Sequence, residues 1–174
     1  ANGAEGDTVS YFDAEGEGGV NVNLNLQGSF QTVGGGMGDD ILIGIENIEG
    51  SDFDDIFIGD AAANFIDGDY GNDTITGGAG NDTLTGGGGS DTFIYQATDT
   101  GVDIIKDFQG YAGGDVLDLT DLTNGYAGND TIGNIVNLLD DGTNTTVQVD
   151  ADGSVNGQTY VDVVTLEGET GLDL

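Results

Sequence analysis

The fold is decided by residues 50–94, which read GSDFDDIFI, GDAAANFID, GDYGNDTIT, GGAGNDTLT and GGGGSDTFI without an insertion. These five units share one period of nine residues, and a fixed period dictates the architecture of a repeat protein. Each unit opens with a hexamer whose sixth residue is a carboxylate or an amide: Asp55, Asn64, Asp73, Asp82 and Asp91. Each closes on a triplet with an apolar middle residue: Phe57, Ile66, Ile75, Leu84 and Phe93. The period therefore predicts one tight turn and one short strand per unit.

The composition of the hexamer predicts a turn that can bind a cation. Glycine allows positive φ and a close approach of the main chain to an ion, and aspartate supplies the hard oxygen that Ca²⁺ prefers. Because side chains alternate across a strand, only the middle residue of each triplet faces inward. Two units then make one coil of eighteen residues, and stacked coils place each turn over the turn two units earlier, with room for a cation between them.

The units resemble the pattern GGxGxDxUx of the RTX (repeats-in-toxin) calcium-binding β-roll, which residues 77–85 and 86–94 match at every position. The resemblance implies an all-β fold, namely a right-handed parallel β-roll with a β-rich C-terminal cap. It implies several Ca²⁺ ions as the only cofactor. The implied side-chain ligands are Asp40, Asp55, Asn64, Asp73, Asp82 and Asp91, with Asp103 beside the final turns. The implied main-chain ligands are Gly36, Gly38, Gly68, Tyr70, Gly77, Ala79, Gly86 and Gly88.

Three regions follow along the chain: a flanking strand segment with an irregular repeat (1–34), the roll (35–94), and a cap with the secretion-associated region (95–174). Residues 35–43, GGMGDDILI, read as a further repeat. We expect the turn of Asp40 to stack on that of Asp55, with Asp55 over Asp73, Asp73 over Asp91 and, on the other edge, Asn64 over Asp82. The early outward residues are apolar, and we expect residues 9–34 to cover them: Ile41, Ile43, Ile56, Ile58 and Phe65.

The nine-residue register is lost from Tyr95 onward, and the cap is less sharply predicted. Strand-like runs occur at 102–108, 115–122, 146–150 and 159–166, whereas 130–139 fits a helix or a strand equally well. For two groups of acidic residues, the sequence does not decide between a metal site and an ordinary surface turn. Asp99, Asp103, Asp107 and Asp115 form a last site or only solvated turns, and DADGSVNG (150–157) is an incomplete EF-hand loop or a plain hairpin turn.

The charge predicts that metal controls folding. The chain has 33 acidic residues and one basic residue, which gives a formal net charge of −32. A chain of this charge is close in composition to intrinsically disordered proteins, and cations must neutralise it before it becomes compact. Without histidine or cysteine there is no His-based triad, thiolate nucleophile, zinc site or disulfide. Paired carboxylates are the catalytic groups of glycosidases, but in so acidic a chain such pairs arise by chance, and we expect no enzyme. A single lysine argues against nucleic acid as a partner, and no apolar stretch is long enough for a membrane span.

The resemblance also implies a function. In the RTX family such a segment is the C-terminal part of an adhesin or toxin of a Gram-negative bacterium, recognised by the type I secretion machinery. It stays unfolded in the low-calcium cytosol and folds outside the cell, in this case as a monomer when isolated. The alternatives are a non-catalytic binding module for a polysaccharide, like the accessory β-roll of an alginate epimerase, and an ice-binding roll that uses the outward threonines.

Overall fold

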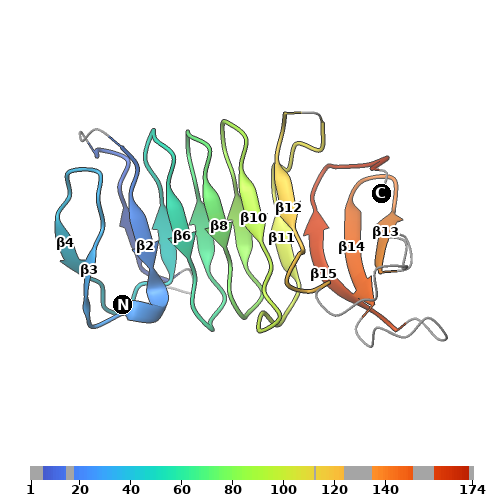
Figure 1. Ribbon diagram of the computed structural model, residues 1–174, viewed down its shortest axis with the longest axis horizontal. Coiled ribbons are helices and arrows are strands. Elements are labelled where there is room, and N and C mark those ends of the chain that lie inside the picture. Colours follow the sequence, from blue (N-terminus) through green and yellow to red (C-terminus); the bar gives the residue numbers. More distant parts are fainter. Residues whose placement is uncertain (1–5, 15–17, 112, 124–134, 151–158, 173–174) are drawn as a thin grey trace.

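The computed structural model describes residues 6–14, 18–111, 113–123, 135–150 and 159–172. Within these ranges the chain consists of short β-strands, and the 3₁₀ turn η1 (Leu24–Leu26) is the only helical element. The strands lie in two rows along the long axis of the molecule (Figure 1). No helix in the described part of the chain is long and apolar enough to cross a membrane.

Two sheets form these rows, and the chain alternates between them along the roll. The eight-stranded sheet has the order β1 (Thr8–Ser10), β5 (Asn47–Glu49), β7 (Phe65–Asp67), β9 (Thr83–Thr85), β11 (Asp103–Ile105), β15 (Tyr160–Leu166), β14 (Thr145–Asp150), β13 (Val136–Asp140). The five-stranded sheet has the order β12 (Val116–Asp118), β10 (Thr92–Ile94), β8 (Thr74–Thr76), β6 (Ile56–Ile58), β2 (Asn21–Asn23). The predicted all-β parallel roll is confirmed.

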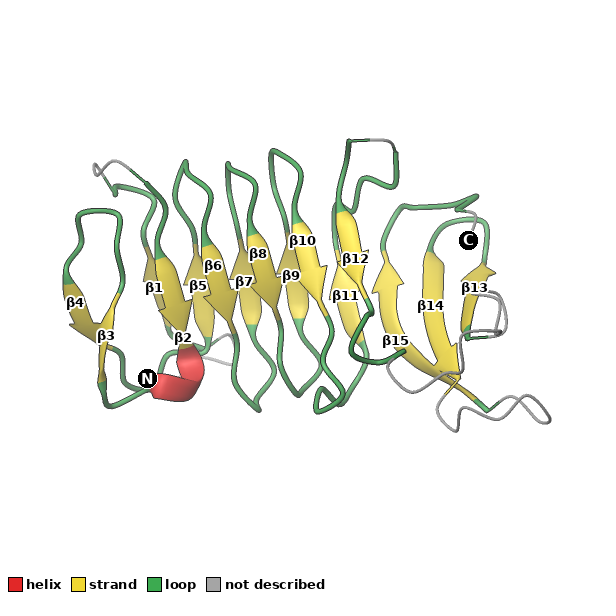
Figure 2. Ribbon diagram, in the orientation of Figure 1, coloured by secondary structure: helices red, strands yellow, loops and turns green. Residues whose placement is uncertain are grey.

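The coil has the predicted length of eighteen residues. In one sheet Phe65 pairs with Thr83, and in the other Ile56 pairs with Thr74, both in parallel. Each pair is separated by eighteen positions, since 83 − 65 and 74 − 56 are equal. Consecutive units therefore alternate between the sheets, and each sheet receives one strand from every coil (Figure 2).

The core is a column of the residues in the middle of each triplet. Phe57, Ile66, Ile75, Leu84 and Phe93 are all 0% exposed. Val22, Ile48 and Ile105 extend the column to coils outside the five units and are also fully buried. Because strand side chains alternate, the neighbours of these residues point away from the column. The inward positions were therefore correctly predicted by the period alone.

The N-terminal end of the roll differs from the prediction. Residues 35–43 do not form a coil, because β4 (Asp39–Ile41) pairs antiparallel with β3 (Phe30–Thr32) in a separate two-stranded sheet. The strand in register is β5, nine residues before β6, with Ile48 in the buried position. Glycines with positive φ at Gly34, Gly35, Gly36 and Gly38 reverse the chain into a hairpin. The glycines of this stretch thus form the turn of a β-hairpin and not a turn of the roll.

The predicted cover over the apolar outward residues is also wrong. Ile43 is 75% exposed, and Ile41, Ile56 and Phe65 are 44–45% exposed. The described residues of the 9–34 segment do not cover these side chains, because β1 pairs with β5 and β2 pairs with β6 as further strands of the two sheets.

The cap contains the expected strands. β11 and β12 fall in the runs at 102–108 and 115–122, and β14 and β15 fall in those at 146–150 and 159–166. The undecided stretch 130–139 includes the start of β13, a strand, although its residues before 135 lie outside the described part. Residues 151–157 of the EF-hand-like run also lie outside it. β15, β14 and β13 form an antiparallel meander at the end of the eight-stranded sheet (Figure 1).

Candidate metal sites along the roll

Sixth-position residues form a ladder along each edge of the stack. On one edge, the main-chain N–H of each residue donates to the side-chain oxygen of its counterpart in the next coil. These contacts are Val20 N to Asp55 Oδ1 (2.6 Å), Asp55 N to Asp73 Oδ1 (2.8 Å), Asp73 N to Asp91 Oδ1 (2.9 Å) and Asp91 N to Asp115 Oδ1 (2.9 Å). On this edge, one carboxylate oxygen per coil therefore accepts a hydrogen bond that joins neighbouring turns.

The second edge repeats the arrangement with more variation. Its contacts are Asp7 N to Glu46 Oε2 (2.7 Å), Asn64 N to Asp82 Oδ1 (2.8 Å) and Asp82 N to Asp103 Oδ1 (2.9 Å). Between Glu46 and Asn64 the direction is reversed, since Asn64 Nδ2 donates to the carbonyl of Glu46 (2.9 Å). An amide can donate where a carboxylate cannot, so Asn64 joins the coils without a charge.

These contacts test the predicted stacking of turns. The pairings of Asp55 with Asp73, Asp73 with Asp91 and Asn64 with Asp82 are confirmed. The predicted pairing of Asp40 with Asp55 is wrong, because Val20 of the preceding coil occupies that place. Asp40 lies in β4, where Tyr11 Oη donates to its Oδ2 over 3.5 Å. Gly36 and Gly38 lie beside it in the hairpin, outside both ladders.

The second oxygen of three aspartates has no partner. Oδ2 of Asp73, Asp82 and Asp91 is buried without a hydrogen bond, and the three residues are only 0–1% exposed. A buried carboxylate oxygen without a partner carries a large desolvation cost. Three such oxygens recur at one position of successive repeats, and a cation bound there would give each of them a partner.

The first glycine of each of these turns lies against the unpartnered oxygen, and in the turn of Asp73 a main-chain oxygen lies there as well. A Cβ built on Gly68 would lie 2.3 Å from Asp73 Oδ2 and 2.5 Å from the carbonyl oxygen of Gly86 in the next coil. Gly77 and Gly86 likewise face their own carboxylates, with Asp82 Oδ2 and Asp91 Oδ2 at 2.5 and 2.3 Å from the built Cβ. Only glycine leaves this space open at the first position. Carboxylate and carbonyl oxygens gathered around an open space are the donor set of Ca²⁺.

The three turns with an unpartnered oxygen share one main-chain conformation. Their second residue has positive φ: 68° at Asp69, 92° at Gly78 and 90° at Gly87. Their fourth residue is a glycine with φ of 130–153°, namely Gly71, Gly80 and Gly89. Asp69 is the only described residue other than glycine with positive φ, and aspartate tolerates this conformation better than most residues do.

The two earlier turns have a different conformation and satisfy the corresponding oxygen themselves. In residues 50–55, Ser51 N donates to Asp55 Oδ2 (2.8 Å) and the Ser51 hydroxyl contacts both carboxylate oxygens. In residues 59–64, Asp60 N donates to Asn64 Oδ1 (2.9 Å). Neither Ser51 nor Asp60 has positive φ. In these two turns the side-chain oxygen is therefore hydrogen-bonded within the turn. In the next three turns the corresponding carboxylate oxygen has no hydrogen-bond partner.

Burial dominates the electrostatics of the ladders. It raises the pKa of Asp73 to about 8, of Asp82 to about 7, and of Asp91 and Asp103 to about 6, against the lowering effect of the ladder hydrogen bonds. Carboxylates in neighbouring coils raise these pKa values further, Asp55 and Asp91 acting on Asp73. The only lysine pairs with Glu167 at the surface, with Lys106 Nζ 2.5 Å from Oε2. The protein itself thus supplies no cation to the ladders.

The residues fit calcium through main-chain and single side-chain donors. No group of three or more acidic, histidine or cysteine side chains in the described ranges forms a compact cluster. Of the predicted main-chain ligands, Gly68, Tyr70, Gly77, Ala79, Gly86 and Gly88 all lie in the three turns with unpartnered oxygens. The side-chain ligands predicted in these turns are Asp73, Asp82 and Asp91, and Asp55 and Asn64 lie in the two self-satisfied turns.

The sequence did not decide whether Asp115, at the end of one ladder, belongs to a metal site or to a solvated turn. The two repeats after Tyr95 were not predicted. Residues 98–106 (TDTGVDIIK) and 110–118 (GYAGGDVLD) place Asp103 and Asp115 in the sixth position and Ile105 and Leu117 in the eighth. Three residues are inserted before each unit, so the ladder steps lengthen from 18 to 21 and 24 positions. A search for the nine-residue pattern that allowed short insertions would have found both.

Comparison with known proteins agrees with these repeats. The model of the RTX calcium-binding nonapeptide repeat (4 copies) matches residues 43–69 and 58–93. Among solved structures, the chain is similar to the AlgE6R3 subunit from the Azotobacter vinelandii mannuronan C5-epimerase, with 31% identity over 68% of this chain and 72% of that one, at a TM-score of 0.25. No curated protein gives a significant match.

Proposed function

The chain belongs to the RTX family of calcium-binding nonapeptide-repeat proteins, and we propose that it is a module that folds when calcium enters its turns. RTX repeats bind several calcium ions per array, so calcium binding itself follows from the family. The proposal concerns which residues bind the ions and what binding does to the chain.

The observation that carries the proposal is the set of buried, unpartnered oxygens of Asp73, Asp82 and Asp91. We assign the calcium ligands to these carboxylates and to main-chain carbonyls of residues 68–71, 77–80 and 86–89. Bound calcium would supply a hard divalent charge to oxygens that otherwise have no partner. Asp55 and Asn64 contribute mainly hydrogen bonds, because Asp55 Oδ2 accepts from Ser51 N and the one side-chain oxygen of Asn64 accepts from Asp60 N.

Calcium binding then becomes folding free energy. With a net charge of −32 the compact state repels itself, and a ligand that binds only the folded state stabilises it by mass action. A site occupied at a hundred times its dissociation constant contributes roughly 2.7 kcal/mol, so a few sites equal the stability of a typical domain.

We further propose where this folding takes place. RTX repeat proteins are typically secreted by Gram-negative bacteria, and a chain that is unfolded without calcium can be exported before it folds. In this proposal the chain is the C-terminal part of a larger adhesin, is exported by type I secretion machinery, and folds as a monomer in extracellular calcium. Residues 1–34, 35–94 and 95–174 act as its N-terminal flank, roll and cap, with the roll taking in β1 and β2 from the flank.

We propose that the chain has no catalytic activity of its own. Its sequence lacks histidine, the commonest general acid-base residue, and cysteine, the source of thiolate nucleophiles. Its many carboxylates form pairs by chance in so acidic a chain. The similar AlgE6R3 subunit comes from an epimerase, so a role beside an enzyme is the alternative. A polyanion-binding surface would need basic residues, and the single lysine is already paired with Glu167.

A calcium titration followed by circular dichroism tests the proposal. We expect little β structure in chelator and a cooperative gain of β signal on adding millimolar Ca²⁺. Mg²⁺ should not replace Ca²⁺, because it requires a smaller octahedral shell and loses water reluctantly. Full β structure in EDTA would contradict calcium-dependent folding.

A matched pair of variants tests the ligands. Asp73→Asn removes a charge at an unpartnered oxygen, whereas Asp69→Asn removes a charge in the same turn at a residue with φ of 68° that asparagine also tolerates. We expect Asp73→Asn to raise the calcium midpoint about tenfold, ~1.4 kcal/mol, and Asp69→Asn to change it little. Equal effects would mean diffuse attraction of calcium without defined sites.

A further inference from the structure

Exposed aromatic side chains gather on one edge of the roll, formed by the turns that run from the eight-stranded sheet to the five-stranded sheet. Four of these turns each carry one aromatic residue that is 38–64% exposed: Phe12, Phe53, Tyr70 and Tyr111. On the opposite edge, the turns of residues 59–64, 77–82 and 98–103 contain no aromatic residue. Exposed apolar groups that gather on one surface mark an interaction site, whereas scattered ones need no explanation.

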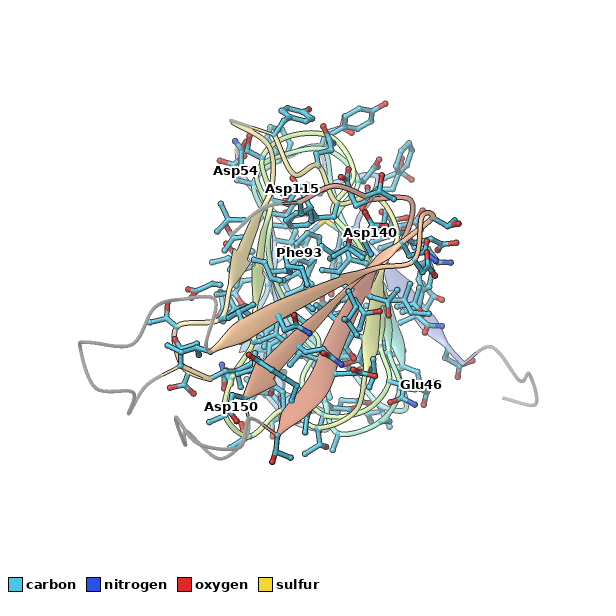
Figure 3. All side chains as sticks on the ribbon, turned by 90° about the vertical axis from the view of Figure 1, so that its right-hand side faces the viewer. Glu46, Asp54, Phe93, Asp115, Asp140 and Asp150 are labelled. Carbon is cyan, nitrogen blue, oxygen red and sulfur yellow. The ribbon has the colours of Figure 1, made fainter. Side chains whose placement is uncertain are left out.

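We propose that these four residues, the aromatic edge, bind an uncharged polysaccharide. The proposal goes beyond calcium-dependent folding, because it uses exposed side chains, whereas the oxygens assigned to calcium are buried. Seen from the cap end, Asp54 and Asp115 of this edge lie on one side of the molecule, and Glu46 of the opposite edge lies on the other (Figure 3). The aromatic edge therefore faces away from the edge that carries Glu46.

Two of the exposed rings are held in place. A Cβ built on Gly88 would lie 3.1 and 3.5 Å from the ring carbons Cδ1 and Cε1 of Tyr70, so this ring lies against the bare main chain of the next coil. The hydroxyl of Tyr111 donates to Gln109 Oε1. A side chain that is already ordered loses little conformational freedom on binding, and tyrosine provides a flat apolar face with a polar tip.

The spacing of the rings follows the stacking of coils. Phe53 precedes β6 and Tyr70 precedes β8, in neighbouring coils, and Tyr111 precedes β12, two coils beyond Tyr70. Neighbouring strands lie about 4.8 Å apart, so these three steps cover about 14 Å. A row of flat rings of this length suits a linear chain of pyranose units. The C–H groups on the face of a sugar ring pack on the electron-rich face of an aromatic ring.

Polar side chains run beside the rings as a hydrogen-bonded row at the fifth position of the turns. Asn72 N and Nδ2 donate to Asp54 Oδ1 (2.7 and 3.1 Å). Ser90 N donates to Asn72 Oδ1 (3.0 Å), and Ser90 Oγ donates to the carbonyl of Gly113 (2.6 Å). Asp54 and Asn72 are exposed, and a carboxylate or an amide has capacity for further hydrogen bonds. This row can therefore bond to the hydroxyl groups of a sugar that stacks on the rings.

Charge favours an uncharged ligand. The chain carries a net charge of −32, and its only lysine is paired with Glu167, so an acidic polymer would be repelled. An ion pair with a cationic ligand needs a carboxylate, but the row continues from Asp54 with the neutral groups of Asn72 and Ser90. Hydroxyl groups bond to carboxylates, amides and hydroxyls alike.

Native gel electrophoresis of the full chain in calcium tests the proposal, with hydroxyethyl cellulose, galactomannan, dextran or heparin cast into separate gels. Tyr70→Ala and Tyr111→Ala each remove one ring of the aromatic edge, and Tyr70→Phe keeps the ring. The control is Phe30→Ala, which removes a still more exposed ring from the β3–β4 hairpin. Circular dichroism at saturating calcium confirms that each variant folds, and Tyr111→Ala covers the case in which Tyr70→Ala folds poorly.

We expect at least one of the three neutral polysaccharides to retard the wild-type chain and heparin not to retard it. Tyr70→Ala and Tyr111→Ala should each weaken the apparent affinity at least fivefold, whereas Tyr70→Phe and Phe30→Ala should stay near the wild type. No retardation by any neutral polysaccharide would overturn the inference. Stronger retardation by heparin, or equal losses in Tyr70→Ala and Phe30→Ala, would overturn it as well. Calcium-dependent folding is tested separately by the circular dichroism titration and stands or falls independently.

Discussion

In three of the sixth-position aspartates, Asp73, Asp82 and Asp91, the two carboxylate oxygens have different surroundings. In Asp73 one oxygen accepts from Asp55 N in the preceding coil, while the other has no partner and is buried. The first contact forms within the protein alone, and we propose that a calcium ion is the partner of the second oxygen. In this proposal the same residue provides both the stacking of turns and a ligand for the metal.

Glycine at position 87 is favoured by both conformation and space, and a pair of variants separates the two. Gly87 has φ of 90°, and a Cβ there would lie 1.9 Å from the carbonyl oxygen of Asp69. Gly113 has a similar φ of 84° but no atom within 4 Å of its built Cβ. We expect Gly113→Ala to cost about 1–2 kcal/mol from the left-handed conformation alone.

Gly87→Ala should cost clearly more, because the Asp69 carbonyl must also move and the turn carries a candidate calcium oxygen. Urea denaturation of both variants at saturating calcium gives the comparison. Equal losses of unfolding free energy would mean that the close stacking of turns contributes nothing beyond the strained φ.

At the level of the strand and turn, two contacts join the roll to the C-terminal cap. One is the packing of two aromatic rings, and the other is a carboxylate that accepts hydrogen bonds from the last repeat. Phe93 of β10 lies 6.2 Å from Phe108, centroid to centroid, and Phe108 is 7% exposed. Asp107, the residue before Phe108, accepts from the amides of Gly86 and Gly87, and β12 pairs with β10 of the last repeat. An uncovered edge would be prone to aggregation; β12 covers the edge of the last repeat and is itself the terminal strand of the five-stranded sheet.

Truncating the junction aromatic should therefore weaken the whole roll. Phe108→Ala should destabilise the calcium-loaded protein by about 3–5 kcal/mol, whereas Tyr111→Ala, in the same loop but 64% exposed, should change stability by less than about 0.5 kcal/mol. Thermal unfolding of both variants at fixed calcium measures the difference. If Phe108→Ala unfolds the cap strands while the melting of the repeats stays unchanged, the cap is an independent unit.

The sequence predicts those elements that follow the nine-residue period and fails where the period is broken. The inward residues and the pairing of Asp73 with Asp91 follow from spacing alone. Residues 35–43 look like a repeat by composition, yet the register of β5 already requires 41–49 as the preceding unit. The repeats around Asp103 and Asp115 were missed because three inserted residues shift each of them. The self-satisfied turn of Ser51 depends on a main-chain conformation that spacing does not encode.

Across the whole molecule, the turns fall into two zones along the stack. The zone of residues 47–67 has its sixth-position oxygens satisfied by Ser51 and Asp60, and its core is complete with Ile48, Phe57 and Ile66. The zone of residues 68–106 contains all three unpartnered carboxylate oxygens. Calcium should therefore stabilise the second zone far more than the first, although stacking couples neighbouring coils.

Hydrogen exchange at graded calcium concentrations tests this division. As calcium falls, we expect the amides of β8, β9 and β10 to lose protection first, because their turns carry buried charges without partners. The amides of β5, β6 and β7 should keep protection to lower calcium, since their turns are closed by hydrogen bonds within the protein. Asp55→Ser is a useful control, because it removes the acceptor of Ser51 N and should abolish the advantage of the first zone. A single calcium midpoint shared by all six strands would mean that the roll folds as one cooperative unit, in which the number of bound ions matters and their position along the stack does not.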